Sequence, residues 1–200
     1  METEKLMPKN ILIEFIFGEE IIRILEKRMP IRELKTESPL FMDYYKMMQP
    51  SLIEPLAKQI AMKILAEGKG IEIIAGSTSP ILAFEVASIL RLPFLWVVNE
   101  KMPEEVKGRK VAFVTDNICT GKHTFEALHY IKHNYAKCED VYCVFDYNFN
   151  LNKGLKDINI FSLLEIEDIK DLEQISKWKE NSRYLFGKEN RKEISPAIAG

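Results

Sequence analysis

The chain of 200 residues has the length of one ordinary domain, and its hydrophobic fraction of 46% is enough for a packed core. Its 28 basic and 30 acidic residues are interspersed and leave a formal net charge of −2, so no basic face indicates a nucleic-acid partner. The cysteines Cys119, Cys138 and Cys143 have no CxxC spacing, which argues against a disulfide framework or a zinc site. No secretory signal and no apolar run of about 20 residues is visible, so we expect a cytoplasmic protein without a membrane segment.

The first fifty residues combine a short helical pattern with a turn-rich stretch. Residues 11–28 carry apolar positions at mixed helical spacing, and Gly18 marks a break in that pattern. The stretch RMPIRELKTESPLFMDYYKMM contains two prolines and is typical of turns or short strands. We therefore predict that residues 1–50 form a small N-terminal cap within a single domain that spans residues 1–200.

From residue 51 onward, helices and apolar strands alternate. The predicted helices are residues 51–67, 80–90 and 124–134, and the predicted strands are residues 71–75, 93–98, 111–114, 141–147 and 158–164. Near-continuous apolar strands separated by helices predict an α/β core over residues 51–170, with a mostly parallel sheet and helices on both faces. A C-terminal helix and tail are expected over residues 171–200. Ligands of such sheets bind beyond the carboxyl ends of the strands, so the residues that follow each strand are the functional candidates.

The segment VAFVTDNICTGKHT has the pattern of a strand, a polar turn and a helix start. Unpaired backbone N–H groups at a helix start suit a phosphate group. Gly121 allows close backbone approach, Thr120 and Thr124 supply hydroxyl donors, and Lys122 supplies a positive charge. Asp116, at the strand end, can accept hydrogen bonds from sugar hydroxyls. Many α/β proteins have such turns without a ligand, so a purely structural turn is the alternative interpretation.

The same segment resembles the phosphoribosyl-pyrophosphate motif of the type I phosphoribosyltransferases. The flanking stretches follow in an order that is similar to that of the orotate phosphoribosyltransferases. LKTESPLFMDYYKMM resembles an early segment of those enzymes, IIAGSTSPILAFEVASILRLPFLWV resembles their pyrophosphate-loop strand and helix, and IFSLLEIEDI resembles their final strand. The resemblance implies the type I phosphoribosyltransferase fold for this chain.

The resemblance also implies roles for individual residues. The expected catalytic residues are Asp116, on the ribose, and Lys35, at the base or the pyrophosphate. The expected contacts to phosphate and phosphoribosyl pyrophosphate are Asp116, Asn117, Cys119, Thr120, Gly121, Lys122, His123 and Thr124. The expected pyrophosphate loop is Gly76, Ser77, Thr78 and Ser79. The implied cofactor is Mg²⁺, bound mainly through the substrate pyrophosphate and not by a metal site of the protein.

Three features depart from the family pattern. Thr115 stands where the first of two motif acids is expected, which removes half of a paired carboxylate grip on ribose. Asn99 and Glu100 stand where an Arg-Lys pair is expected, and the stretch that follows is too short for a mobile lid. Lys122 and His123 replace small or hydroxylated residues, either as phosphate contacts or as solvated residues. Losing one fixed contact to developing negative charge typically slows catalysis on the order of 10²–10³-fold.

Two functions follow as hypotheses. The first is transfer of a phosphoribosyl group from phosphoribosyl pyrophosphate to a base, such as the pyrimidine orotate, with release of pyrophosphate. The second is non-catalytic binding of phosphoribosyl pyrophosphate or a nucleotide by a sensor or partner subunit on the same fold. An unrelated doubly wound α/β protein is a third interpretation.

The expected partners are a small-molecule substrate and a second copy of the chain. The resemblance implies a homodimer, and the stretch LFMDYYKMM offers an apolar and aromatic contact surface. Met42, Met47 and Met48 would make that surface adaptable.

Overall fold

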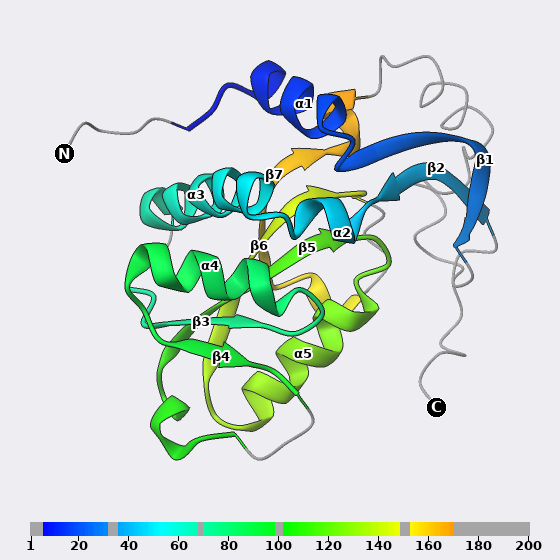
Figure 1. Cartoon of the computed structure of the whole chain (residues 1–200). Helices are drawn as coiled ribbons and strands as arrows, with labels where there is room; N and C mark the ends of the chain where they lie inside the picture. The colour runs from blue at the N-terminus through cyan, green and yellow to red at the C-terminus, as the bar shows by residue number, and fades with distance from the viewer. Residues whose placement is uncertain (1–5, 32–35, 68–69, 99–101, 149–152, 170–200) are drawn as a thin grey trace.

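The computed structural model describes residues 6–31, 36–67, 70–98, 102–148 and 153–169. A five-stranded sheet lies at the centre, in the order β4-β3-β5-β6-β7, and every neighbouring pair of strands in it is parallel (Figure 1). Its strands are β3 (Ile73–Gly76), β4 (Phe94–Trp96), β5 (Lys110–Ile118), β6 (Lys137–Asp146) and β7 (Asn159–Glu165). The mostly parallel sheet that the sequence predicted is confirmed.

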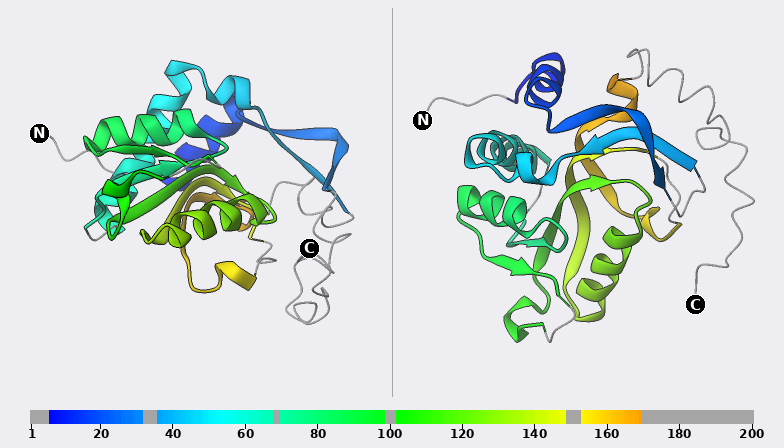
Figure 2. Two further views of the ribbon diagram at one scale, coloured as in Figure 1. Left: turned by 90° about the horizontal axis from the view of Figure 1, so that it is seen from below. Right: turned by 45° about the vertical axis from the view of Figure 1, so that its right-hand side comes forward.

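Helices cover both faces of this sheet, as predicted. The helices α1 (Lys9–Gly18), α3 (Pro50–Glu67) and α4 (Pro80–Leu90) pack on one face, and α5 (Lys122–His133) packs on the other (Figures 1 and 2). Because the strands are buried on both faces, the sheet separates two apolar clusters. The remaining short elements are α2 (Tyr44–Met47) and the 3₁₀ turns Glu104–Val106, Lys153–Leu155 and Ile166–Ile169.

The N-terminal region contains a two-stranded antiparallel ribbon, formed by β1 (Ile22–Ile31) and β2 (Thr36–Met42). The helical spacing noted for residues 11–28 is therefore wrong beyond Gly18. The chain reverses there, since Glu20 has a φ of 55° and the Ile21 N–H bonds to the Ile16 carbonyl at 2.9 Å. This reversal ends α1 and starts a strand where the sequence suggested more helix.

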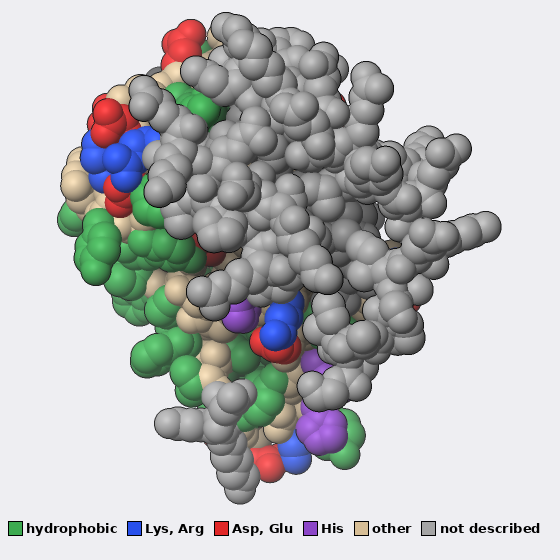
Figure 3. All heavy atoms as spheres, turned by 90° about the vertical axis from the view of Figure 1, so that its right-hand side faces the viewer, with side chains coloured by type: hydrophobic (Ala, Val, Ile, Leu, Met, Phe, Trp, Pro, Cys, Tyr) green, Lys and Arg blue, Asp and Glu red, His purple; other side chains and the backbone are tan. Residues whose placement is uncertain are grey.

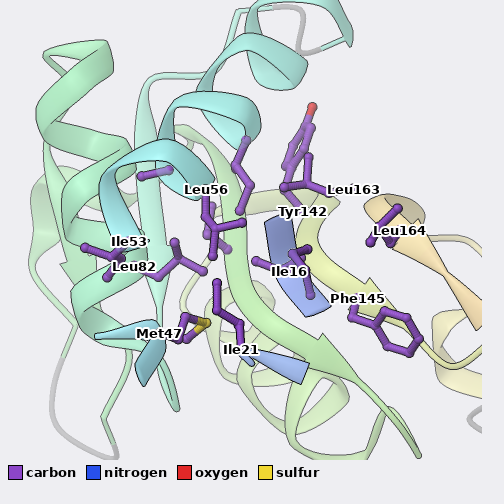
Figure 4. Packing of buried hydrophobic residues seen from close by; sticks show 14 of the residues in the cluster. Ile16, Ile21, Met47, Ile53, Leu56, Leu82, Tyr142, Phe145, Leu163 and Leu164 are labelled. Atoms are coloured by element: carbon purple, nitrogen blue, oxygen red, sulfur yellow. The ribbon is translucent and has the colours of Figure 1, made fainter. Parts of the chain in front are cut away.

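Residues of the N-terminal region also belong to the main core. The side chains of Ile16 and Ile21 are fully buried and lie in the same cluster as Leu56 of α3 (Figure 4). Met42 and Met47 are buried in this cluster too. The expectation that Met42 and Met47 contribute to a contact surface is therefore wrong, because their side chains are buried, while Met48 is partly buried and the homodimer itself stays a prediction.

Some predictions concern residues that the structure does not describe. Lys35, residues 99–101 and residues 171–200 lie outside the described residues. The catalytic role of Lys35 and the C-terminal helix and tail therefore stay predictions. Among the described helices, none has both the length and the apolar character that crossing a bilayer requires.

Candidate functional site

The polar residues of the phosphate-type segment lie at the carboxyl end of the central strand. β5 continues four residues beyond its predicted end, because Asn117 pairs with Phe145 and Ile118 pairs with Asp146 of β6. Asp116, predicted at the end of the strand, and Asn117 therefore both lie within it, and the predicted end at residue 114 is corrected to Ile118. Only residues 119–121 connect β5 to α5.

The turn after β5 presents the first backbone turn of α5. Gly121 immediately precedes the helix and has a φ of 74°, a left-handed conformation that glycine adopts without steric penalty. Being a glycine, it has no side chain that could cap the helix. The Lys122 N–H lies 3.4 Å from Thr120 Oγ1, a long hydrogen bond, while Cys119 is partly buried and Thr124 is buried. The helix start thus has the backbone geometry that suits an anion.

The two basic residues of this turn point to solvent. Lys122 and His123 are exposed, and His123 Nδ1 lies 3.5 Å from Glu126 Oε2 one turn along the helix. Figure 3 shows the histidine side chains, all of which belong to α5, as separate purple patches on the surface. Phosphate recognition here would therefore depend on the backbone of the turn more than on these side chains.

Asp116 is buried and is hydrogen-bonded within the protein. Its side chain is 1% exposed. The Oδ1 atom accepts hydrogen bonds from Ser79 Oγ at 2.7 Å and Thr115 Oγ1 at 3.1 Å, and Oδ2 accepts one from Asn117 Nδ2 at 2.6 Å. A carboxylate offers about four lone-pair positions, so these donors use most of its accepting capacity. None of the ion pairs between described residues includes Asp116.

The predicted pyrophosphate loop lies beside Asp116, because β3 and β5 are neighbours in the sheet. Gly76 ends β3, Ser77 is half-buried and Thr78 is exposed. Ser79 immediately precedes α4, but its hydroxyl does not cap that helix and instead donates to Asp116. The structure therefore brings the two predicted loops together at one edge of the sheet. The Asp116 charge also lies near the positive end of the α4 dipole, where it is favoured.

Tyr44 of α2 joins this network, and the sequence analysis did not identify it as a site residue. Its hydroxyl lies 3.1 Å from Ser79 Oγ. Burial and the nearby negative charge of Asp116 raise the pKa of Tyr44 above its usual range, so the phenol stays protonated. No local sequence pattern links α2 to a loop 35 residues further along the chain, so no signal in the sequence could have identified this contact.

Several contacts hold α2, and with it Tyr44, in place. Asp43 caps the helix by accepting the Lys46 N–H at 3.1 Å, and its other carboxylate oxygen pairs with Arg23 at 3.1 Å. Lys46 pairs with Glu20 at 2.8 Å. These contacts tie α2 to β1 and to the reversal that precedes it.

The described bases between β4 and the start of β5 lie far from this site. Lys107 and Arg109 precede β5, and Lys110 begins it. Eight residue steps separate Lys110 from Ile118, a distance of about 26 Å along a strand. Lys107 pairs with Glu104, Arg109 with Glu72 and Lys110 with Asp140. These cations are therefore held at the opposite edge of the sheet.

The side chains at this site do not fit a metal held by the protein. Within the described ranges there is no group of three or more His, Cys, Asp or Glu side chains that could hold a metal ion. The donors around Asp116 are hydroxyl and amide groups. Mg²⁺ bound through the pyrophosphate of a substrate stays a proposal.

The sheet order, the two helical layers and the turn after β5 define an α/β protein with its candidate ligand site at the carboxyl edge of the sheet. No protein-family model and no curated protein sequence matches the chain. Solved structures do match, and they have the type I phosphoribosyltransferase fold, which is therefore the fold of this chain, as the sequence resemblance implied.

Three of these structures illustrate the likeness. UMP synthase of Leishmania donovani matches with a TM-score of 0.68 and 15% identity, over 92% of this chain and 41% of that chain. Orotate phosphoribosyltransferase of Francisella tularensis matches with a TM-score of 0.67 and 17% identity, over 86% of this chain and 98% of that chain. The Mycobacterium tuberculosis H37Rv orotate phosphoribosyltransferase, in complex with inorganic phosphate, matches with a TM-score of 0.60 and 16% identity, over 80% of this chain and 97% of that chain. Adenine phosphoribosyltransferases also match. The chain thus spans less than half the length of the UMP synthase.

Proposed function

We propose that the chain binds a phosphorylated ribose compound, either phosphoribosyl pyrophosphate or a nucleotide, with its 5′-phosphate at the turn between β5 and α5. The observation that carries this proposal is the start of α5 behind Gly121, whose φ of 74° turns the backbone into the helix without a capping side chain. Backbone N–H groups in this arrangement bind anions without any cationic side chain. Inorganic phosphate in the M. tuberculosis enzyme of the same fold is the ligand chemistry that such a turn suits.

Binding without rapid transfer is the function that the geometry supports best. Asp116 lies hydrogen-bonded to Ser79 at the start of α4, where the family resemblance expects a pyrophosphate. Two negative groups at that position repel each other in a poorly solvated site. Thr115, in place of the first motif acid, is buried and donates to Asp116, so it does not face a ligand. We therefore propose a sensor or partner subunit as the first function.

Phosphoribosyl transfer to a base is the second candidate. It is supported by the likeness to orotate phosphoribosyltransferases over 80% or more of this chain. The base would be a pyrimidine such as orotate, and Mg²⁺ bound mainly through the pyrophosphate would neutralise its charge. A pyrophosphate-release assay with orotate, uracil and adenine separates the two functions. Turnover with one base establishes transfer, and ligand binding without turnover establishes the sensor.

Calorimetric titration with phosphoribosyl pyrophosphate and Mg²⁺ tests the binding proposal, and two glycine variants locate the site. Gly121 and Gly108 both have a φ of 74°, but only Gly121 belongs to the turn after β5. Replacing either with alanine places a side chain in the left-handed region, at a cost of about 1–2 kcal/mol of stability. We expect only Gly121→Ala to weaken the phosphate ligand, by about tenfold, because a charge-assisted hydrogen bond is crowded there.

Equal ligand affinity of the Gly121→Ala and Gly108→Ala proteins would remove the turn after β5 as the phosphate site. Absence of any binding heat with the unsubstituted chain would contradict both candidate functions.

A further inference from the structure

The two hydroxyl groups of Tyr44 and Ser79 lie in series against the carboxylate of Asp116. We propose that the Ser79 hydroxyl, held in place by Tyr44, occupies a hydrogen-bonding position that a ribose hydroxyl would take at Asp116, so that Tyr44 determines how much a sugar contributes to ligand affinity. This inference rests on the proposed phosphate site at the turn after β5, and it assigns a specificity-determining role to a residue of the N-terminal region.

The accepting capacity of Asp116 is the first step of the argument. Thr115 and Asn117 are its neighbours in β5, so their hydrogen bonds of 3.1 and 2.6 Å move with it. Ser79 comes from another element and takes a further position on Oδ1 at 2.7 Å. With about four lone-pair positions on a carboxylate, at most one remains. A ribose diol brings two O–H donors, so one of the present donors has to leave.

The donor pattern is the second step. Tyr44 Oη lies 3.1 Å from Ser79 Oγ, and Ser79 Oγ in turn donates to Asp116. Burial and the negative charge of Asp116 raise the pKa of Tyr44, so the phenol stays protonated and can donate to Ser79. The Ser79 hydroxyl thus supplies one of the two donors that a vicinal diol would bring to this carboxylate. Tyr44 holds that hydroxyl in place.

The difference in burial between Ser79 and Tyr44 indicates which of these two side chains can move to admit a sugar. Ser79 is fully buried, whereas Tyr44 is 37% exposed. The backbone of α2 is tied down through Asp43 and Lys46, so the Tyr44 side chain can turn outward while the helix stays in place. Once the phenol leaves, the Ser79 hydroxyl has no second partner from α2 and can reorient. Tyr44 is therefore the residue whose removal favours a sugar at Asp116.

This arrangement predicts that the unsubstituted protein gains little affinity from a ribose. Part of the energy gained from the sugar hydroxyls at Asp116 is spent on breaking the contact between Tyr44 and Ser79. Inorganic phosphate and ribose 5-phosphate should therefore bind with similar affinity. The ligand class follows: small phosphorylated compounds are selected by their phosphate group more than by their sugar.

Titration of three proteins with inorganic phosphate and with ribose 5-phosphate tests the inference. Tyr44→Phe removes the hydroxyl that holds Ser79, and Tyr45→Phe is the matched control, since Tyr45 is 91% exposed and adjacent in sequence. We expect Tyr44→Phe to bind ribose 5-phosphate about tenfold more tightly, the worth of one hydrogen bond to a charged group. Phosphate affinity should be equal in all three proteins, and Tyr45→Phe should match the unsubstituted chain with both ligands.

The outcomes separate this inference from the proposed function. Unchanged or weaker ribose 5-phosphate binding by Tyr44→Phe, with phosphate binding intact, overturns the role of Tyr44 alone. Absence of phosphate binding by the unsubstituted chain overturns the phosphate site and this inference together. Should Tyr44→Phe not fold, Ser79→Ala removes the hydroxyl that Tyr44 holds against Asp116 Oδ1, and the same gain for ribose 5-phosphate is expected.

Discussion

Two carboxylates lie near the carboxyl ends of neighbouring strands of the sheet, and their surroundings differ. Asp116 of β5 accepts three side-chain hydrogen bonds. Asp146 of β6 accepts the Asn148 N–H at 2.7 Å and lies in register with Glu165 of β7. Burial first, and then the charge of Glu165, raise the pKa of Asp146 above its ordinary value, while the Asn148 N–H opposes this shift. Asp146 is therefore a carboxylate whose charge is disfavoured in the folded protein.

Asp146→Asn is expected to stabilise the protein at neutral pH. Because the folded pKa of Asp146 is raised, the folded state binds its proton more tightly than the unfolded state does. The stability of the native protein then falls as pH rises from about 4, the unfolded pKa, through the folded pKa. Asparagine keeps an acceptor for the Asn148 N–H and carries no charge. Urea unfolding should show a larger gain in stability at pH 7 than at pH 4.

The exposed Asp157 offers a control for that experiment. Asp157→Asn should leave the unfolding free energy nearly unchanged at both pH values. A gain from Asp146→Asn that is equal at pH 4 and pH 7 would show that the benefit does not come from removing the charge.

Elements with local boundary signals were predicted well from the sequence. The predicted helix 80–90 coincides with α4, because Pro80 fixes its first turn and Arg91 ends it in a left-handed conformation with a φ of 55°. The carboxyl end of β5 was misplaced, because residues 115–118 are apolar only in part and become a strand by pairing with β6. The start of α5 was placed two residues late, since the backbone of Gly121 and not a side chain sets it.

The candidate site likewise has one part that the sequence predicts and one part that it does not. Its turn after β5 could be identified from one continuous stretch of sequence, because strand, turn and helix start are local features. The contacts of Asp116 with other elements could not, since Ser79 donates to it across 37 positions and Tyr44 reaches Ser79 across 35. Such contacts depend on how the N-terminal region packs on the sheet, which local patterns do not encode.

The packing of α4 on β3 gives a prediction at the level of elements. A Cβ atom at Gly76 would lie 2.5 Å from the Ala83 Cβ and 3.4 Å from the Val114 carbonyl oxygen. Gly76→Ala should therefore push α4 away from the sheet and cost about 1–3 kcal/mol in unfolding free energy. Thermal and urea unfolding measure this loss.

Gly18→Ala is the matched control for Gly76→Ala, because no atom lies within 4 Å of a Cβ built at Gly18. It should leave the stability unchanged or raise it slightly, since alanine favours a helix more than glycine does. Equal effects of the two substitutions would show that α4 and β3 are not in close contact at Gly76.

For the whole molecule, the proposed homodimer needs an apolar surface other than the methionines of residues 42–48. Ile81, Phe84 and Trp96 are each more than half exposed and lie on α4 and the edge strand β4. Phe84 meets Phe94 edge to face, and Trp96 follows Phe94 by two positions on the same face of the strand. Exposed apolar patches of this kind mark contact surfaces, so we propose that a second copy of the chain covers this one.

Light scattering at micromolar concentration should give twice the 23.2 kDa mass of the chain. Ile81→Asp should reduce it to the monomer, because it puts a charge into the proposed contact while an acid near the start of α4 remains favourable for the helix. Ile11→Asp is the control, as Ile11 is another exposed isoleucine near the start of a helix, α1. A monomer mass for the unsubstituted chain would contradict the homodimer.

The contact between α1 and the end of the described core has a consequence for synthesis on the ribosome. Lys9 pairs with Asp168 at 2.7 Å across 159 positions, and α1 packs against β7. The helix is therefore made early, but its binding surface is complete only after β7 has emerged. At about 5–20 residues per second, that interval is roughly 8–30 s. During it α1, with the apolar side chains of Leu12 and Ile16, lacks its contacts with β7, so we expect the nascent chain to need a chaperone that holds exposed apolar segments.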